Sequence, residues 1–180
     1  MRPVTVRTHI TAPREEIFDF VADLANRLAY GDHYMEDLRL TRPNSIGVGA
    51  AARFELGTPF GSQWAEIAVA EHDRPRRLSE AGRVGRLGRT RFGAVYEFTQ
   101  DGGATRVELT TWSEPGSRGD ALRESLGVRS WTRRKTKRAL ERLRKIFEEE
   151  QTEPLRRTTI AGYDLATSPR YGSYVESPAP

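Results

Sequence analysis

Residues 120–150, with the sequence DALRESLGVRSWTRRKTKRALERLRKIFEEE, have the pattern of one long amphipathic helix near the C-terminus. They follow a loop rich in glycine and serine, and Asp120 suits the N-cap because its carboxylate can accept hydrogen bonds from the first turn. At about 100° per residue, one face of this helix gathers Val128, Thr132, Thr136, Ala139, Leu140, Leu143, Ile146 and Phe147. This face requires a packing partner elsewhere in the chain.

The two ends of this face differ in size. The N-terminal half carries Thr132 and Thr136, which are short and polar, whereas the C-terminal half carries bulky apolar side chains from Leu140 to Phe147. We therefore expect the C-terminal half to pack tightly and the N-terminal half to border an open space.

Upstream segments alternate between apolar and polar residues, as half-buried strands do. Two short helices are expected after the first strand, over residues 12–26 and 27–34. Helices on one face of an antiparallel sheet give an α+β domain, and a twisted sheet curved around the long helix leaves a space between them. The segments expected as strands are 4–10, 37–42, 47–56, 63–71, 77–83, 90–100 and 105–112.

The chain of 180 residues suits one domain, residues 1–150, followed by a flexible or loosely docked tail, residues 151–180, with four prolines and no helical period. No apolar run approaches the ~20 residues that span a bilayer, and no signal peptide is evident, so we expect a cytoplasmic protein. The chain has no cysteine, and its three histidines lack metal-ligand spacing. Neither a metal nor a cofactor is therefore expected.

The net charge is +4, and the densest basic run lies on the long helix. One interpretation is transient contact with an anionic membrane surface. The favoured interpretation is a solvated helix face with internal pairs such as Glu141–Lys145. Nucleic-acid binding is not favoured, because basic residues are spread over most segments of the chain.

Six segments recur in one known superfamily in this order. The first strand runs into Thr11, Ala12 and Pro13, and the others are IFDFVAD at 17–23, GVGA at 47–50, EHDRPRRL at 71–78, GGATRV at 102–107 and LERLR at 140–144. Together they resemble the START-like superfamily, also called SRPBCC or Bet v 1-like, and its polyketide cyclase/dehydratase branch. The resemblance spans residues 3–150. Many relatives carry a tryptophan soon after the first helix, where this chain has Leu28, Ala29 and Tyr30.

The resemblance implies the helix-grip fold, a curved antiparallel sheet of about six to seven strands wrapped around a long C-terminal helix. Members bind lipids, sterols, quinones or polyketides in the cavity, and some catalyse cyclisation or dehydration there. The fold alone does not decide between these functions. The expected partner is therefore a small hydrophobic ligand, and the oligomeric state is open.

Side chains on the inward phases supply the candidate ligand-binding residues. Glu80 shares the phase of Leu78, so it is either an acid in the cavity or a strand-end residue facing water. His33 is either an acid/base group or part of an exposed turn, and each apolar candidate is about as readily explained as core. The candidates are Tyr30, His33, Phe54, Leu56, Ile67, Glu80, Phe92, Tyr96, Leu109, Thr111, Thr132, Thr136 and Leu140.

Three functions remain open from the sequence. The favoured one is a non-catalytic carrier or sensor of a small hydrophobic ligand, because no catalytic set of residues stands out. The second is a cyclase or dehydratase using Tyr30, His33 or Glu80 as acid/base groups. The third is an interaction module using the basic helix. Trp131 should lie opposite the apolar face if the helix is regular, unless Gly127 kinks it.

Overall fold

The computed structural model describes residues 1–85, 88–117, 119, 121, 127–150, 155, 157 and 158. Seven strands form one antiparallel sheet in the order β1-β7-β6-β5-β4-β3-β2. The elements are β1 (Val4–Ile10), α1 (Arg14–Ala22), the short 3-10 helix η1 (Leu24–Asn26), α2 (Arg27–Gly31), β2 (Met35–Leu40), β3 (Ala51–Thr58), β4 (Gly61–Asp73), β5 (Arg77–Val84), β6 (Thr90–Asp101), β7 (Ala104–Glu114) and α4 (Arg129–Glu148).

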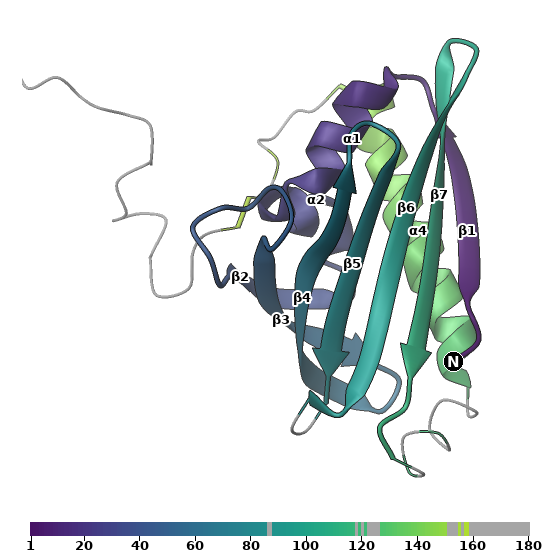
Figure 1. The fold of residues 1–180 in the computed structure, drawn as a ribbon. Helices are drawn as coiled ribbons and strands as arrows, with labels where there is room; N and C mark the ends of the chain where they lie inside the picture. Colours follow the sequence, from purple (N-terminus) through teal and green to yellow (C-terminus); the bar gives the residue numbers. More distant parts are fainter. Residues whose placement is uncertain are drawn as a thin grey trace, which may run out of the picture.

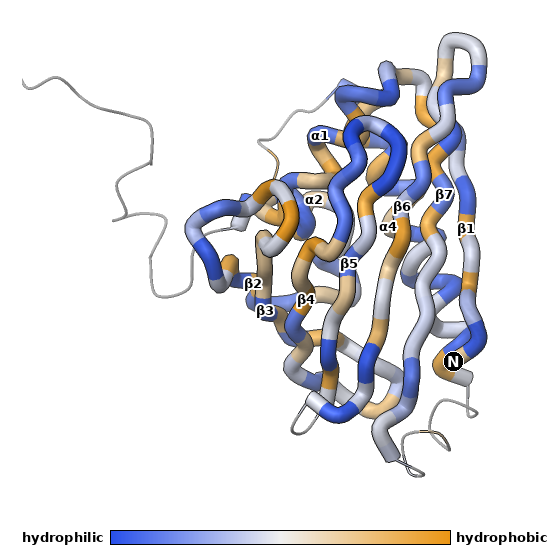
Figure 2. Tube along the Cα trace, viewed as in Figure 1, coloured by the Kyte–Doolittle hydropathy of each residue, from blue (hydrophilic) through white to orange (hydrophobic). Residues whose placement is uncertain are grey.

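The sheet curves around α4, which runs along its concave face, while α1 and α2 cover the end of the same face (Figure 1). Hydrophobic and hydrophilic residues alternate along the strands (Figure 2), so one side of each strand faces α4 and the other faces solvent. The expected α+β, helix-grip architecture is confirmed.

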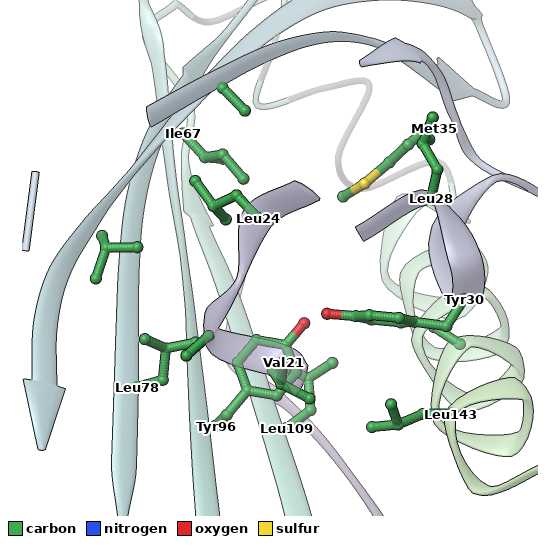
Figure 3. Packing of buried hydrophobic residues seen from close by; sticks show 14 of the residues in the cluster. Val21, Leu24, Leu28, Tyr30, Met35, Ile67, Leu78, Tyr96, Leu109 and Leu143 are labelled. Carbon is green, nitrogen blue, oxygen red and sulfur yellow. The ribbon is translucent and has the colours of Figure 1, made fainter. Parts of the chain in front are cut away.

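The core lies where α1 and the C-terminal half of α4 meet the sheet. Leu140 and Leu143 of α4 are buried, as are Phe18 of α1 and Leu109 of β7. Figure 3 shows Leu143 on the α4 side of this space, apart from Val21 and Leu109. Tight packing at this end of α4 agrees with the bulky side chains from Leu140 to Phe147.

The long helix begins later than the sequence pattern indicated. Its regular part starts at Arg129, because Gly127 has a φ of 103°, a left-handed conformation that interrupts a right-handed helix. Residues 120 and 122–126 lie outside the described residues, and with them the predicted N-cap at Asp120.

Other boundaries also differ from expectation. The second helix ends at Gly31 instead of residue 34, and β2 begins at Met35 instead of residue 37. The strand expected from residue 47 begins at Ala51, because Gly47 and Gly49 both have positive φ and form a turn. The register is also irregular within β2, between Glu36 and Arg39, and within β4, between Val69 and Glu71.

Within the described ranges, no helix combines the length and the apolar character needed to cross a bilayer. Of the predicted tail, only residues 155, 157 and 158 are described. Arg157 Nη2 donates to Asp23 Oδ2 at 2.6 Å, and the Thr158 amide donates to the Ala25 carbonyl at 2.8 Å. These two contacts hold that part of the chain against the start of η1.

Candidate functional site

A cavity of about 200 Å³ lies between the concave face of the sheet and the N-terminal half of α4. Apolar side chains dominate its wall. An apolar protein cavity of ~150 Å³ admits benzene, so this one has room for at least a substituted ring. The described residues that line it are Met1, Arg27, Tyr34, Met35, Phe54, Leu56, Thr58, Phe60, Gln63, Ile67, Glu80, Val84, Thr90, Phe92, Gly93, Ala94, Tyr96, Leu109, Thr111, Trp112, Ser113, Val128, Trp131, Thr132, Lys135 and Thr136.

Short side chains on α4 leave this space open. Thr136 Oγ1 donates to the Thr132 carbonyl at 2.8 Å, so the hydroxyl is bonded back to its own helix. Further along α4, Leu140 and Leu143 are buried and belong to the packed core. The floor is also shaped by a glycine. A Cβ on Gly82 would lie 2.5 Å from the Phe92 ring, so the ring lies directly over that residue.

A buried polar cluster stands in the otherwise apolar wall. Arg27 from α2 donates through Nη1 to Tyr96 Oη at 2.7 Å and through Nη2 to the Glu80 carboxylate. Arg27 is 2% exposed and Glu80 is 4% exposed. The guanidinium carbon also lies 5.5 Å and 5.4 Å from the ring centroids of Tyr30 and Tyr96. Each buried charge thus has the partner that it needs to be tolerated away from water.

Burial and the ion pair set the charge states of this cluster. Burial lowers the pKa of the Arg27 guanidinium, but the facing Glu80 carboxylate raises it, and the pKa ends well above its ordinary value. Burial raises the pKa of the Tyr30 and Tyr96 hydroxyls. Arg27 therefore stays charged and both tyrosines stay protonated at physiological pH.

Two of the three buried hydroxyls that lack a hydrogen-bond partner among the described residues lie at or beside the cavity, and the third belongs to Thr158. Thr111 Oγ1 is one, and Thr111 lines the cavity. The Tyr30 hydroxyl is the other, and it points toward the Tyr96 hydroxyl without a hydrogen bond of normal geometry (Figure 3). Because buried polar groups are usually bonded, the Thr111 hydroxyl is suited to a polar atom of a ligand.

The chain matches one protein family. Residues 1–148 match the family described as polyketide cyclase / dehydrase and lipid transport. The chain belongs to this family. The predicted resemblance to the START-like superfamily is thereby confirmed, and this membership with the fold supports hydrophobic-ligand binding as the general role of the chain.

Solved structures share the family fold at low sequence identity. TTHA0849 from Thermus thermophilus has a TM-score of 0.61 and 18% identity over 79% of this chain and 94% of that one. Ara h 8.0201 has a TM-score of 0.60 and 8% identity over 83% of this chain and 99% of that one. DynU16, a protein in the dynemicin biosynthetic locus, has a TM-score of 0.58 and 20% identity, but only 50% of DynU16 is covered against 87% of this chain. These likenesses show the fold alone. No curated protein sequence matches the chain.

The cavity of this family member brings together ten of the thirteen candidate residues. Glu80 is among them, because the bonded Arg27 lets a carboxylate remain inside. The open choice between the cavity and water is thus settled toward the cavity. The ten are Phe54, Leu56, Ile67, Glu80, Phe92, Tyr96, Leu109, Thr111, Thr132 and Thr136.

Three candidates do not line the cavity. Tyr30 is buried beside the polar cluster, behind the wall. His33 Nε2–H donates to the Lys135 carbonyl at 3.0 Å, which turns its ring toward α4. Leu140 lies one turn beyond Thr136, in the closed part of the core.

Other wall residues were missed from the sequence. No sequence pattern around Arg27 indicated that it lines the cavity. The one indirect indication was that an inward Glu80 would need a buried cation as its partner. Trp131 was expected opposite the apolar face, yet it lines the cavity and meets the Tyr34 ring edge-on at a centroid distance of 6.5 Å. Trp131 and Lys135 lie at the edge of the apolar face, one position before each threonine, and their long side chains reach the cavity.

Proposed function

We propose that the chain is a carrier or sensor that binds a small hydrophobic ligand, such as a lipid, quinone or polyketide, in the cavity beside α4. The observation that carries this proposal is a wall that is apolar except for a few placed polar groups, the usual composition of a ligand site. The only carboxylate among the described lining residues is already bonded to Arg27. Binding therefore fits the wall better than proton transfer does.

The polar end of the cavity suits a ligand with a neutral oxygen. The Tyr96 hydroxyl accepts a hydrogen bond from Arg27, so its own proton can be donated to a ligand oxygen or to the neighbouring Tyr30 hydroxyl. Thr111 supplies a second hydroxyl within the same wall. A carbonyl or hydroxyl on the ligand would suit either group.

Native mass spectrometry of the full chain after exposure to a lipid extract tests the proposal. We expect one bound molecule in the natural sequence and none in Ala94→Phe, since Ala94 lines the cavity. The control is Val95→Phe, on the opposite face of the same strand, which should retain the ligand. Absence of any adduct in the natural sequence, or equal binding by both variants, would contradict the proposal.

A second candidate is a cyclase or dehydratase acting on a polyketide-like substrate in the same cavity. Glu80 and Tyr96 favour it, because a carboxylate and a phenol lie together inside the wall. His33 does not join them. Glu80→Gln separates the two functions: a carrier keeps its ligand with at most a moderate loss of affinity, whereas an enzyme binds substrate and loses turnover.

A further inference from the structure

The charges that line the cavity do not cancel. Three charged side chains belong to the wall, namely Arg27, Glu80 and Lys135. Arg27 and Glu80 neutralise each other through their ion pair. Lys135 has no carboxylate partner among the described residues, so the side chains of the wall keep one positive charge uncompensated.

Lys135 is held in place at the wall. Its ammonium donates to the His33 carbonyl at 2.8 Å, and the Lys135 carbonyl accepts from His33 Nε2 at 3.0 Å. The side chain is half-buried where α4 meets the corner between α2 and β2. An ammonium group has three donors, so two remain for another acceptor. The reciprocal contact reduces the entropy that Lys135 would lose on binding one.

The surrounding helix surface is also positive. In the N-terminal half of α4, the exposed Arg129, Arg133, Arg134 and Arg138 have no carboxylate partner in the part of the chain that the structure describes. The C-terminal half differs, since its basic residues pair with carboxylates. Those pairs are Arg142–Asp32, Arg144–Glu148 and Lys145–Glu149. Positive potential is thus concentrated beside the cavity, where it attracts anions.

We propose that the ligand is a small organic anion whose carboxylate, sulfonate or phosphate oxygen binds the Lys135 ammonium while its apolar body fills the cavity. This rests on the proposed function and names the ligand class. The anion lies at Lys135 and not at Arg27, because Arg27 is already neutralised by Glu80. A cavity of about 200 Å³ is too small to enclose both chains of a phospholipid, which favours a free acid over a membrane lipid.

Calorimetric titration with three probes that share one apolar body tests this inference. The probes are 2-naphthoate, 2-naphthylmethanol and 2-naphthylmethylamine, titrated into the full chain at low and high salt. We expect the acid to bind about tenfold more tightly than the alcohol, the scale of one charge-assisted hydrogen bond, and the amine to bind most weakly. Added salt should weaken the binding of the acid and should not weaken the binding of the other two probes.

Substitutions locate the anion. Lys135→Gln should lower the affinity for the acid about tenfold more than the affinity for the alcohol, so that the preference for the acid is lost. Lys135→Arg should retain much of that preference. The control is Lys137→Gln on the exposed side of the same helix, which should change neither affinity. Thermal unfolding verifies that each variant is folded.

Three outcomes would overturn the inference. Equal affinity for acid and alcohol would do so while leaving the proposed function intact. The same loss from Lys137→Gln as from Lys135→Gln would show a diffuse charge effect with no site at Lys135. Failure of all three probes to bind would count against both proposals.

Discussion

At the scale of single residues, the ion pair between Arg27 and Glu80 links stability to the cavity. Replacing Glu80 with Ala leaves a buried guanidinium without its carboxylate. We expect a loss of about 3–5 kcal/mol in the free energy of unfolding, because an uncompensated buried charge is costly. Urea denaturation measures it.

A double variant provides the control for this prediction. Arg27→Met combined with Glu80→Leu removes both charges and keeps similar volume, so most of the lost stability should return. The exposed pair between Arg7 and Glu108 supplies a second comparison, and Glu108→Gln should change stability far less than Glu80→Ala. Similar losses from both single variants would mean that Glu80 is solvated.

His33 gives the fold a dependence on pH. Burial, aided by the nearby charges of Lys135 and Arg138, lowers the pKa of His33 below its ordinary value of 6.5, although the hydrogen bond to the Lys135 carbonyl opposes this. As the pH falls below about 6.5, the unfolded chain takes up a proton that the folded chain does not, so stability decreases. The hydrogen bond from Arg74 lowers the pKa of Asp19 below its ordinary value of 3.8, so Asp19 affects stability only at a lower pH than His33 does.

The free energy of unfolding should therefore fall between pH 6.5 and 5 more steeply in the natural sequence than in His33→Asn. Above pH 7 the two profiles should run parallel, because His33 is then neutral in both states. Urea denaturation at several pH values checks this, and identical slopes below pH 6.5 would refute it.

Strand phase left the direction of Glu80 open between the cavity and water, and it did not indicate a partner. Glu80 shares the phase of Leu78, and the structure buries both. Arg27 lies on a five-residue helix 53 positions earlier, and no local pattern connects the two. Contacts that join separate elements depend on the packing of the whole fold, which sequence periodicity does not encode.

At the scale of elements, the close approach between β4, β5 and β6 depends on Gly82. A Cβ at this position would lie 2.4 Å from the Glu66 carbonyl oxygen and 2.5 Å from the Phe92 ring. Because the carbonyl belongs to a strand and cannot yield easily, Gly82→Ala should cost about 1–3 kcal/mol of stability. Gly103 has open space around its Cβ position, so Gly103→Ala should stay within about 0.5 kcal/mol.

Thermal unfolding of both glycine variants measures this difference. The substitution at Gly82 should also displace the Phe92 ring and weaken probe binding, whereas that at Gly103 should not. A Gly82→Ala variant as stable as Gly103→Ala would show that the sheet adjusts at this point.

The elements themselves were largely predictable, because hydrophobic periodicity decides which face of a strand or helix is buried. The sheet, both short helices and the long helix were expected from it. The start of α4 at Arg129 was not, although Gly127 was recognised as a possible kink, because its left-handed conformation leaves no periodic signal. The start of β3 was missed for the same reason at Gly47 and Gly49.

At the scale of the whole molecule, the cavity exists because one long helix meets the curved sheet with two different surfaces. The contrast between Thr132 and Thr136 at one end and Leu140 to Phe147 at the other indicated which end would be open. The volume could not be predicted, because it depends on the curvature of seven strands together. The ligand-binding role of the wall residues remains a proposal.

The most direct test of the account compares Thr136→Trp with Leu143→Ala, using 2-naphthylmethanol titration and urea denaturation on each. Thr136→Trp should reduce affinity at least about tenfold, because its ring occupies the cavity, and should cost no more than about 1–3 kcal/mol of stability. Leu143→Ala should cost about 2–5 kcal/mol and retain binding, since Leu143 belongs to the closed core. Equal loss of stability in the two variants, or undiminished binding by Thr136→Trp, would contradict a ligand cavity beside the N-terminal half of α4.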